Sequence, residues 1–147
     1  MRFANFRRDS MRVFKLAFIA LFAMTLLVAC GKKSPEDVAR AFVEKSYAGD
    51  ADAVIAMLHV SERAEAKPGE QELLTGKLRA MVAEKKAEAD DRGGVEKITT
   101  EGAQAHPGDA KRASVEVTVH FKQGTSTKER VNLVETDKGW RVRAGIF

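Results

Sequence analysis

The chain has few of the residues on which covalent cross-linking and metal binding depend. One cysteine and three histidines occur among its 147 residues. A single cysteine excludes an intrachain disulfide, and the histidines have no spacing typical of a metal site. We therefore expect no metal ion and no cofactor. The one cysteine, Cys30, is free for other chemistry.

An excess of positive charge is also absent from most of the chain, although the formal net charge is +4. Five of the 25 basic residues and one of the 21 acidic residues precede Cys30, which leaves 20 of each sign from Cys30 onward. The two signs are interspersed there. Because nucleic-acid binding depends on clustered Lys and Arg that neutralise phosphates, we expect no nucleic-acid partner.

A long apolar run is missing as well. The longest apolar run, residues 16–29, has 14 residues and no charge, whereas a transmembrane helix needs about 20. Basic residues precede this stretch and small residues end it, as in a secretory signal peptide. An N-terminal anchor that stays in place is the alternative. Met1 and Met11 both remain as candidate start residues.

The end of this stretch, Leu27-Val28-Ala29-Cys30, resembles the lipobox of bacterial lipoproteins. The resemblance implies that residues 1–29 are a cleaved signal peptide and that Cys30 carries a diacylglycerol and an added acyl chain such as palmitate. Two or more chains anchor a protein stably in a membrane, whereas one does so marginally. Gly31 replaces the aspartate that retains enteric lipoproteins in the inner membrane. The resemblance therefore implies an outer-membrane anchor that faces the periplasm.

Residues 34–91 have the pattern of three helices. Ser34-Pro35 predicts a helix start, Gly49 predicts its end, and Asp50 caps a second, short helix over residues 51–58. A third helix is predicted over residues 70–89 from its apolar stripe. The charged turns at its end, residues 84–91, are interpreted as a solvated helix face.

From residue 93 onward the apolar period changes from near four to two. Residues 113–121 alternate strictly, which predicts an antiparallel strand with one buried face. Strands are also predicted over residues 95–100, over residues 126–135 and from Trp140 to the chain end, with short turns. The predicted fold class is α+β, with N-terminal helices packed on a curved antiparallel sheet. Residues 30–33 form the expected tether and residues 34–147 one domain.

Several segments of this domain together resemble the small bacterial lipoproteins of the domain of unknown function 4878 family. They are Ser34–Val38, Tyr47–Asp50, Val115–Val119, Phe121–Gly124, Val131–Val134 and Asp137–Val142. That family is similar to the nuclear transport factor 2 and ketosteroid-isomerase superfamily, whose fold is a cystatin-like cone. The resemblance implies this cone fold, but it implies no established activity.

The superfamily resemblance also indicates where a site would lie, because its enzymes place acids, a histidine or tyrosines inside the cone. The predicted inward positions here are apolar, with Glu135 the main polar exception. All three histidines are expected outside the cone, and no catalytic residue is predicted. Tyr47, Glu135 and Trp140 are the candidate pocket residues, since Tyr and Trp pair an apolar body with one polar atom. The alternative for Trp140 is a place in the core against the first helix.

These observations favour a lipid-anchored envelope protein with a non-catalytic domain that binds a small ligand or another envelope protein. An isomerase- or dehydratase-like enzyme is the alternative, and it requires an ionisable residue that faces a pocket inside the cone. A third hypothesis is a homodimer formed through the open sheet face, which would cover Thr118, His120, Asn132 and Arg141. The remaining expected partner is the membrane, into which the lipid on Cys30 would insert.

Overall fold

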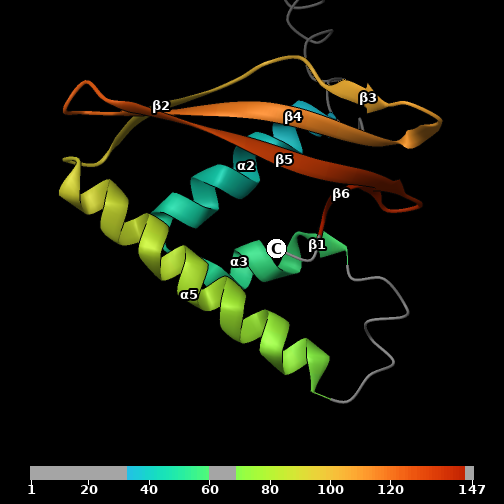
Figure 1. The fold of residues 1–147 in the computed structure, drawn as a ribbon, viewed down its shortest axis with the longest axis horizontal. Helices are drawn as coiled ribbons and strands as arrows, with labels where there is room; N and C mark the ends of the chain where they lie inside the picture. The colour runs from blue at the N-terminus through green and yellow to red at the C-terminus, as the bar shows by residue number, and fades with distance from the viewer. Residues whose placement is uncertain (1–32, 60–68, 145–147) are drawn as a thin grey trace, which may run out of the picture. The chain divides into compact units, whose positions relative to one another are not determined.

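The computed structural model describes residues 33–59 and 69–144, which form helices and a mixed sheet. The helices are α2 (Pro35–Ala48), α3 (Ala51–Ala56) and α5 (Glu70–Asp91). The strands are β1 (Leu58–His59), β2 (Val95–Thr100), β3 (Gln104–His106), β4 (Asp109–Phe121), β5 (Ser126–Thr136) and β6 (Gly139–Arg143). Figure 1 shows the helices on one side of the long β4–β5 ribbon. The α+β class is therefore confirmed.

The sheet has the order β1-β6-β5-β4-β2, with β3 also paired to β4. All of these pairs are antiparallel except β1 with β6. β4 and β5 form the long central ribbon, from Arg112 opposite Val134 to His120 opposite Ser126. This register places alternate residues of both strands on the face that the helices cover.

Two short strands are absent from the sequence-based prediction. The second helix ends at Ala56, two residues earlier than predicted, and β1 then pairs in parallel with β6 through Leu58 and Val142. β3 pairs with the first half of β4. A strand of two or three residues is too short to show an alternation of apolar and polar side chains. It depends on a partner strand for its hydrogen bonds, so its own residues do not predict it.

The first helix begins and ends as predicted. The Ser34 hydroxyl accepts a hydrogen bond from the Asp37 backbone N–H at 3.1 Å, and Gly49 ends the helix with φ of 84°. In addition, the Glu36 carboxylate accepts the backbone N–H of Ala103 at 2.8 Å. That bond lowers the pKa of Glu36, since it favours the charged form. It joins the start of α2 to the residue before β3.

The core lies between α2, α5 and the inner face of the sheet. Strand β4 contributes four side chains with no exposed area, namely Val115, Val117, Val119 and Phe121. From α2 come Val38, Ala39, Phe42, Val43 and Tyr47, and from α5 come Leu78, Val82 and Ala89. None of the described helices is long and apolar enough to cross a membrane.

Candidate functional site

A largely buried acid lies on the inner sheet face. Glu129 stands on β5 opposite Val117, on the same face as the buried Val131. Lys85 of α5 forms an ion pair with its Oε1 atom. The Tyr47 hydroxyl, from α2, donates to the same oxygen at 2.6 Å. The side chains of Lys85 and Glu129 are each only 18% exposed, so this pair is largely removed from water.

Further polar groups surround this acid. Glu88 of α5 lies 3.4 Å from the Tyr47 hydroxyl through Oε2, and its Oε1 atom accepts from Thr127 at 3.4 Å. Arg92 pairs with Glu88 at 3.0 Å and lies 4.8 Å from the centre of the Phe121 ring. Such a network of charge-assisted bonds satisfies each member and holds α5 against the sheet.

Tyr47 is the centre of this arrangement. Its ring packs edge-on against Phe121 with 5.7 Å between centroids, and the Lys85 ammonium lies 4.9 Å from its centre. Burial raises the pKa of Tyr47 far above its ordinary value, and the hydrogen bond to Glu129 raises it further. Tyr47 is therefore a neutral donor at physiological pH, which excludes it as a general base.

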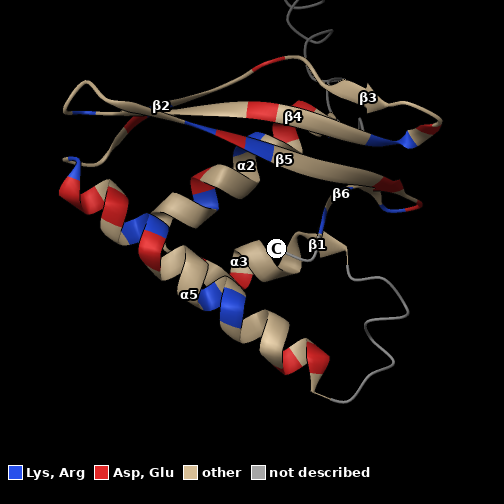
Figure 2. Ribbon diagram, in the orientation of Figure 1, with Lys and Arg blue, Asp and Glu red and all other residues tan. Residues whose placement is uncertain are grey.

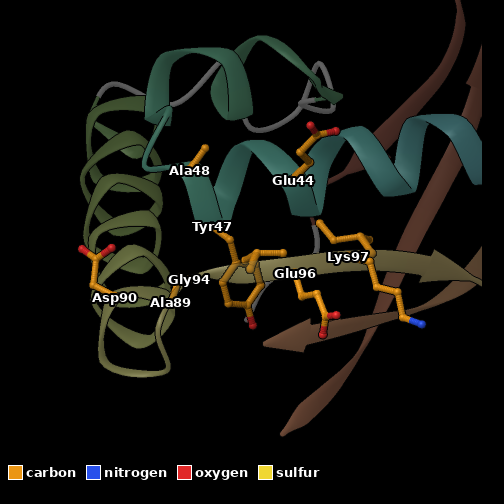
Figure 3. A pocket seen from close by; sticks show the side chains of 10 residues that line it. Glu44, Tyr47, Ala48, Ala89, Asp90, Gly94, Glu96 and Lys97 are labelled. Atoms are coloured by element: carbon orange, nitrogen blue, oxygen red, sulfur yellow. The ribbon is translucent and has the colours of Figure 1, made fainter. Parts of the chain in front are cut away.

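A pocket of about 470 Å³ opens beside Tyr47, between α2, the end of α5 and β2. It is lined by Glu44, Tyr47, Ala48, Ala89, Asp90, Gly94, Val95, Glu96, Lys97 and Ile98. Figure 3 shows the Tyr47 ring in the middle of this pocket, while the carboxylates of Glu44 and Asp90 point away from it. The pocket thus has an apolar floor and a charged rim, and its volume is in the range of small-ligand sites.

The three predicted pocket residues do not come together. Tyr47 lines the pocket described above. Glu135 and Trp140 face each other across β5 and β6 beside the hairpin that joins these strands, both half-buried. Trp140 packs against the core, as in the alternative interpretation. Neither residue lines the Tyr47 pocket. Cys30 lies outside the described residues.

The histidines lie outside the core. His120 faces outward from β4 and its Nε2 atom is 3.3 Å from the Thr99 hydroxyl. His59 and His106 are exposed. Within residues 33–59 and 69–144, no group of three or more His, Cys, Asp or Glu side chains could hold a metal ion.

Glu129 and Lys85 were both missed by sequence reasoning, and only Glu129 had a readable signal. The alternation that places Val131 inward also places Glu129 inward when it is continued two residues towards the N-terminus. Lys85 belongs to the charged turns that were interpreted as a solvated helix face. That interpretation is wrong for Lys85, since it faces the sheet and pairs with Glu129.

Helices packed on one face of a curved, largely antiparallel sheet define the nuclear transport factor 2-like (NTF2-like) class of cone folds. The sequence profile of the family described as domain of unknown function (DUF4878) matches residues 28–143. The chain belongs to this family, as the sequence resemblance predicts. No curated protein matches the chain.

A solved structure agrees with this class. The crystal structure of a Campylobacter jejuni protein described as an NTF2-like transpeptidase is 29% identical, with a TM-score of 0.67. The match covers 77% of this chain and all of that one, and it confirms the predicted cone fold. A structure of Aln2 from a Streptomyces species is 18% identical over 77% of this chain and 90% of its own, with a TM-score of 0.34.

Proposed function

We propose that this protein is a lipid-anchored binding protein of the bacterial envelope, and that its cone domain holds a small ligand without catalysing a reaction. One observation carries the proposal. The charged groups around Tyr47 are paired with one another, Lys85 with Glu129 and Glu88 with Arg92, while an open pocket with an apolar floor lies alongside. An acid and a base that are paired with each other are not free for catalysis, and the pocket remains accessible to a ligand.

An enzymatic function is the alternative, and it would have to use the same interior groups. An isomerase or dehydratase needs a free base or acid within hydrogen-bond reach of its substrate. Glu129 already accepts from both Lys85 and Tyr47. A substrate would have to break this ion pair before the carboxylate could take a proton, which opposes catalysis at this position.

The activity in the description of the Campylobacter protein does not transfer readily to this chain. Acyl transfer in a transpeptidase needs an activated hydroxyl or thiol beside a base. In the described residues a hydroxyl contacts a histidine at Thr99 and His120, on the outward side of the sheet. That pair does not line the Tyr47 pocket. The binding function therefore remains the one that the geometry favours.

The anchor is tested by replacing Cys30 with alanine. We expect the Cys30→Ala protein to lose all incorporation of radiolabelled palmitate and to accumulate as an uncleaved precursor, because no thiol remains to accept the diacylglycerol. Membrane fractionation with palmitate labelling in the native host measures both effects. Lys32→Ala is the control and should label normally. A Cys30→Ala protein that is still labelled and cut would contradict the anchor.

The pocket is tested by filling it. We expect native mass spectrometry of the detergent-purified full-length protein to show a bound small molecule, and Ala48→Trp to reduce its occupancy about tenfold. Ala48 is an exposed pocket residue at the end of α2, so an indole there would take up part of the pocket. Ala83→Trp, on the exposed side of α5, is the matched control. Equal occupancy in both variants, or a wild-type protein without ligand, would exclude this site.

A further inference from the structure

A second pocket, of about 260 Å³, lies on the outward side of the sheet, across from the helices. Its floor is one row of the sheet, since Gln104 of β3 pairs with Ser114 of β4 and Ser114 pairs with Asn132 of β5. Three arginines, Arg112, Arg130 and Arg143, surround this row, whereas no Asp or Glu of the described residues lines the pocket. This composition is unusual in a domain whose charges otherwise balance.

The arginines of this pocket are incompletely neutralised. Arg112 pairs with Asp109 at 3.0 Å. Arg130 and Arg143 are exposed, and neither forms an ion pair or side-chain hydrogen bond with the described part of the chain. Glu116, directly across from Arg130, is paired with Lys128 at 2.5 Å. The guanidinium groups of Arg130 and Arg143 therefore remain available to form hydrogen bonds with an anion. Figure 2 shows basic segments at the β3 end of β4 and on β6.

The chemistry of the lining selects the anion. A guanidinium presents its N–H groups as a planar fork that matches the oxygens of a phosphate, and the resulting charge-assisted bonds are strong. The Ser114 hydroxyl and the Asn132 amide add neutral donors on the floor of the pocket. We propose that the pocket bounded by Arg112, Arg130 and Arg143 binds a phosphate group, supplied by the headgroup of an anionic membrane lipid.

The position of the pocket near the expected anchor supports a membrane lipid as the source of the phosphate. This choice of source rests on the proposed lipid tether at Cys30. Glu36, in the first turn of α2, is bonded to Ala103, the residue before β3. β3 in turn forms one side of the pocket. Cys30 and Ser34 are four residues apart, which limits their separation to about 14 Å. A lipid on Cys30 would therefore hold this edge of the sheet at the membrane surface.

The test measures phosphate binding by the full-length protein in a neutral detergent. Isothermal titration calorimetry with soluble dihexanoyl phosphatidylglycerol is expected to show saturable binding, and dihexanoyl phosphatidylcholine is expected to bind much more weakly. The variant Arg130→Gln/Arg143→Gln should weaken phosphatidylglycerol binding at least about tenfold, because two charge-assisted contacts are lost. The variant Lys77→Gln/Arg79→Gln removes two exposed charges from α5 and should change the affinity less than about twofold.

A parallel titration with inorganic phosphate distinguishes the sources of the ligand. Saturable binding of inorganic phosphate without binding of phosphatidylglycerol overturns the lipid source and assigns the pocket to a soluble phosphate compound. Absence of saturable binding to both probes, or equal weakening in the two double variants, overturns the site. Palmitate labelling of Cys30 is independent of these titrations, so failure of the site and failure of the proposed anchor can be told apart.

Discussion

Replacing Glu129 with leucine is expected to lower the free energy of unfolding by about 3 kcal/mol, because Lys85 would keep its charge in a largely buried position without its partner. Both side chains are 18% exposed, so the effect should lie at the lower end of the range for buried pairs. The Tyr47 hydroxyl would also lose its shortest hydrogen bond. Urea-induced unfolding followed by circular dichroism measures the change.

A second replacement separates the loss of the pair from the loss of the acid. The double variant Lys85→Met/Glu129→Leu should recover to within about 1 kcal/mol of wild type, since apolar side chains of similar size can substitute for a buried pair. Asp90→Leu, which removes an exposed pair with Lys86, is the control and should cost less than about 1 kcal/mol. If Glu129→Leu and Asp90→Leu lower the free energy of unfolding by the same amount, the contacts among Tyr47, Lys85 and Glu129 have no special role in stability.

Truncating Phe121 to alanine is expected to cost about 4 kcal/mol, because the residue is fully buried at the end of β4. The cavity would remove the edge-on contact with Tyr47, at 5.7 Å between centroids, and the contact with the Arg92 guanidinium at 4.8 Å. Both contacts connect the helices to the sheet. The expected result in thermal unfolding is therefore a large decrease in Tm with unchanged strand content at low temperature.

The control for this truncation is Leu73→Ala on α5, where the leucine is 61% exposed. Its free energy of unfolding should change by less than about 0.5 kcal/mol, since little apolar area is removed from contact. A loss at Phe121→Ala as small as that at Leu73→Ala would mean that the ring does not fill the interior in solution. The difference between the two variants measures how much the Phe121 ring contributes to the packing of the helices against this end of the sheet.

The replacements at Glu129 and Phe121 concern the same physical question, which is how a cone fold avoids an empty centre. Tyr47 and Phe121 fill the interior, and the charges of Lys85 and Glu129 neutralise each other. Because the interior is filled and its charges are paired, the accessible pocket lies beside the interior, next to β2, and not at its centre. This is the structural basis of the proposed binding function without catalysis.

Local features could be predicted because they depend on neighbouring residues. The Ser34 cap, the left-handed Gly49 and the alternation of β4 each involve residues a few positions apart, and all three are present in the structure. β1 and β3 could not be predicted, since each depends on a partner strand for its hydrogen bonds. The inward position of Glu129 could be predicted from the alternation pattern, but its pairing with Lys85 on α5 could not.

The sequence by itself determined the order of the main elements and the family, and it predicts a lipobox cysteine, because caps, apolar periods and short motifs are local. Only the tertiary structure decided which charges meet. Glu129 lies 82 residues from Tyr47 and 44 residues from Lys85, and the three join because α2 and α5 pack against the same face of β5. The arginine pocket likewise exists only when β3, β4, β5 and β6 lie side by side. Coulomb interactions depend on distance in space, and distance in space follows from the packing of the elements.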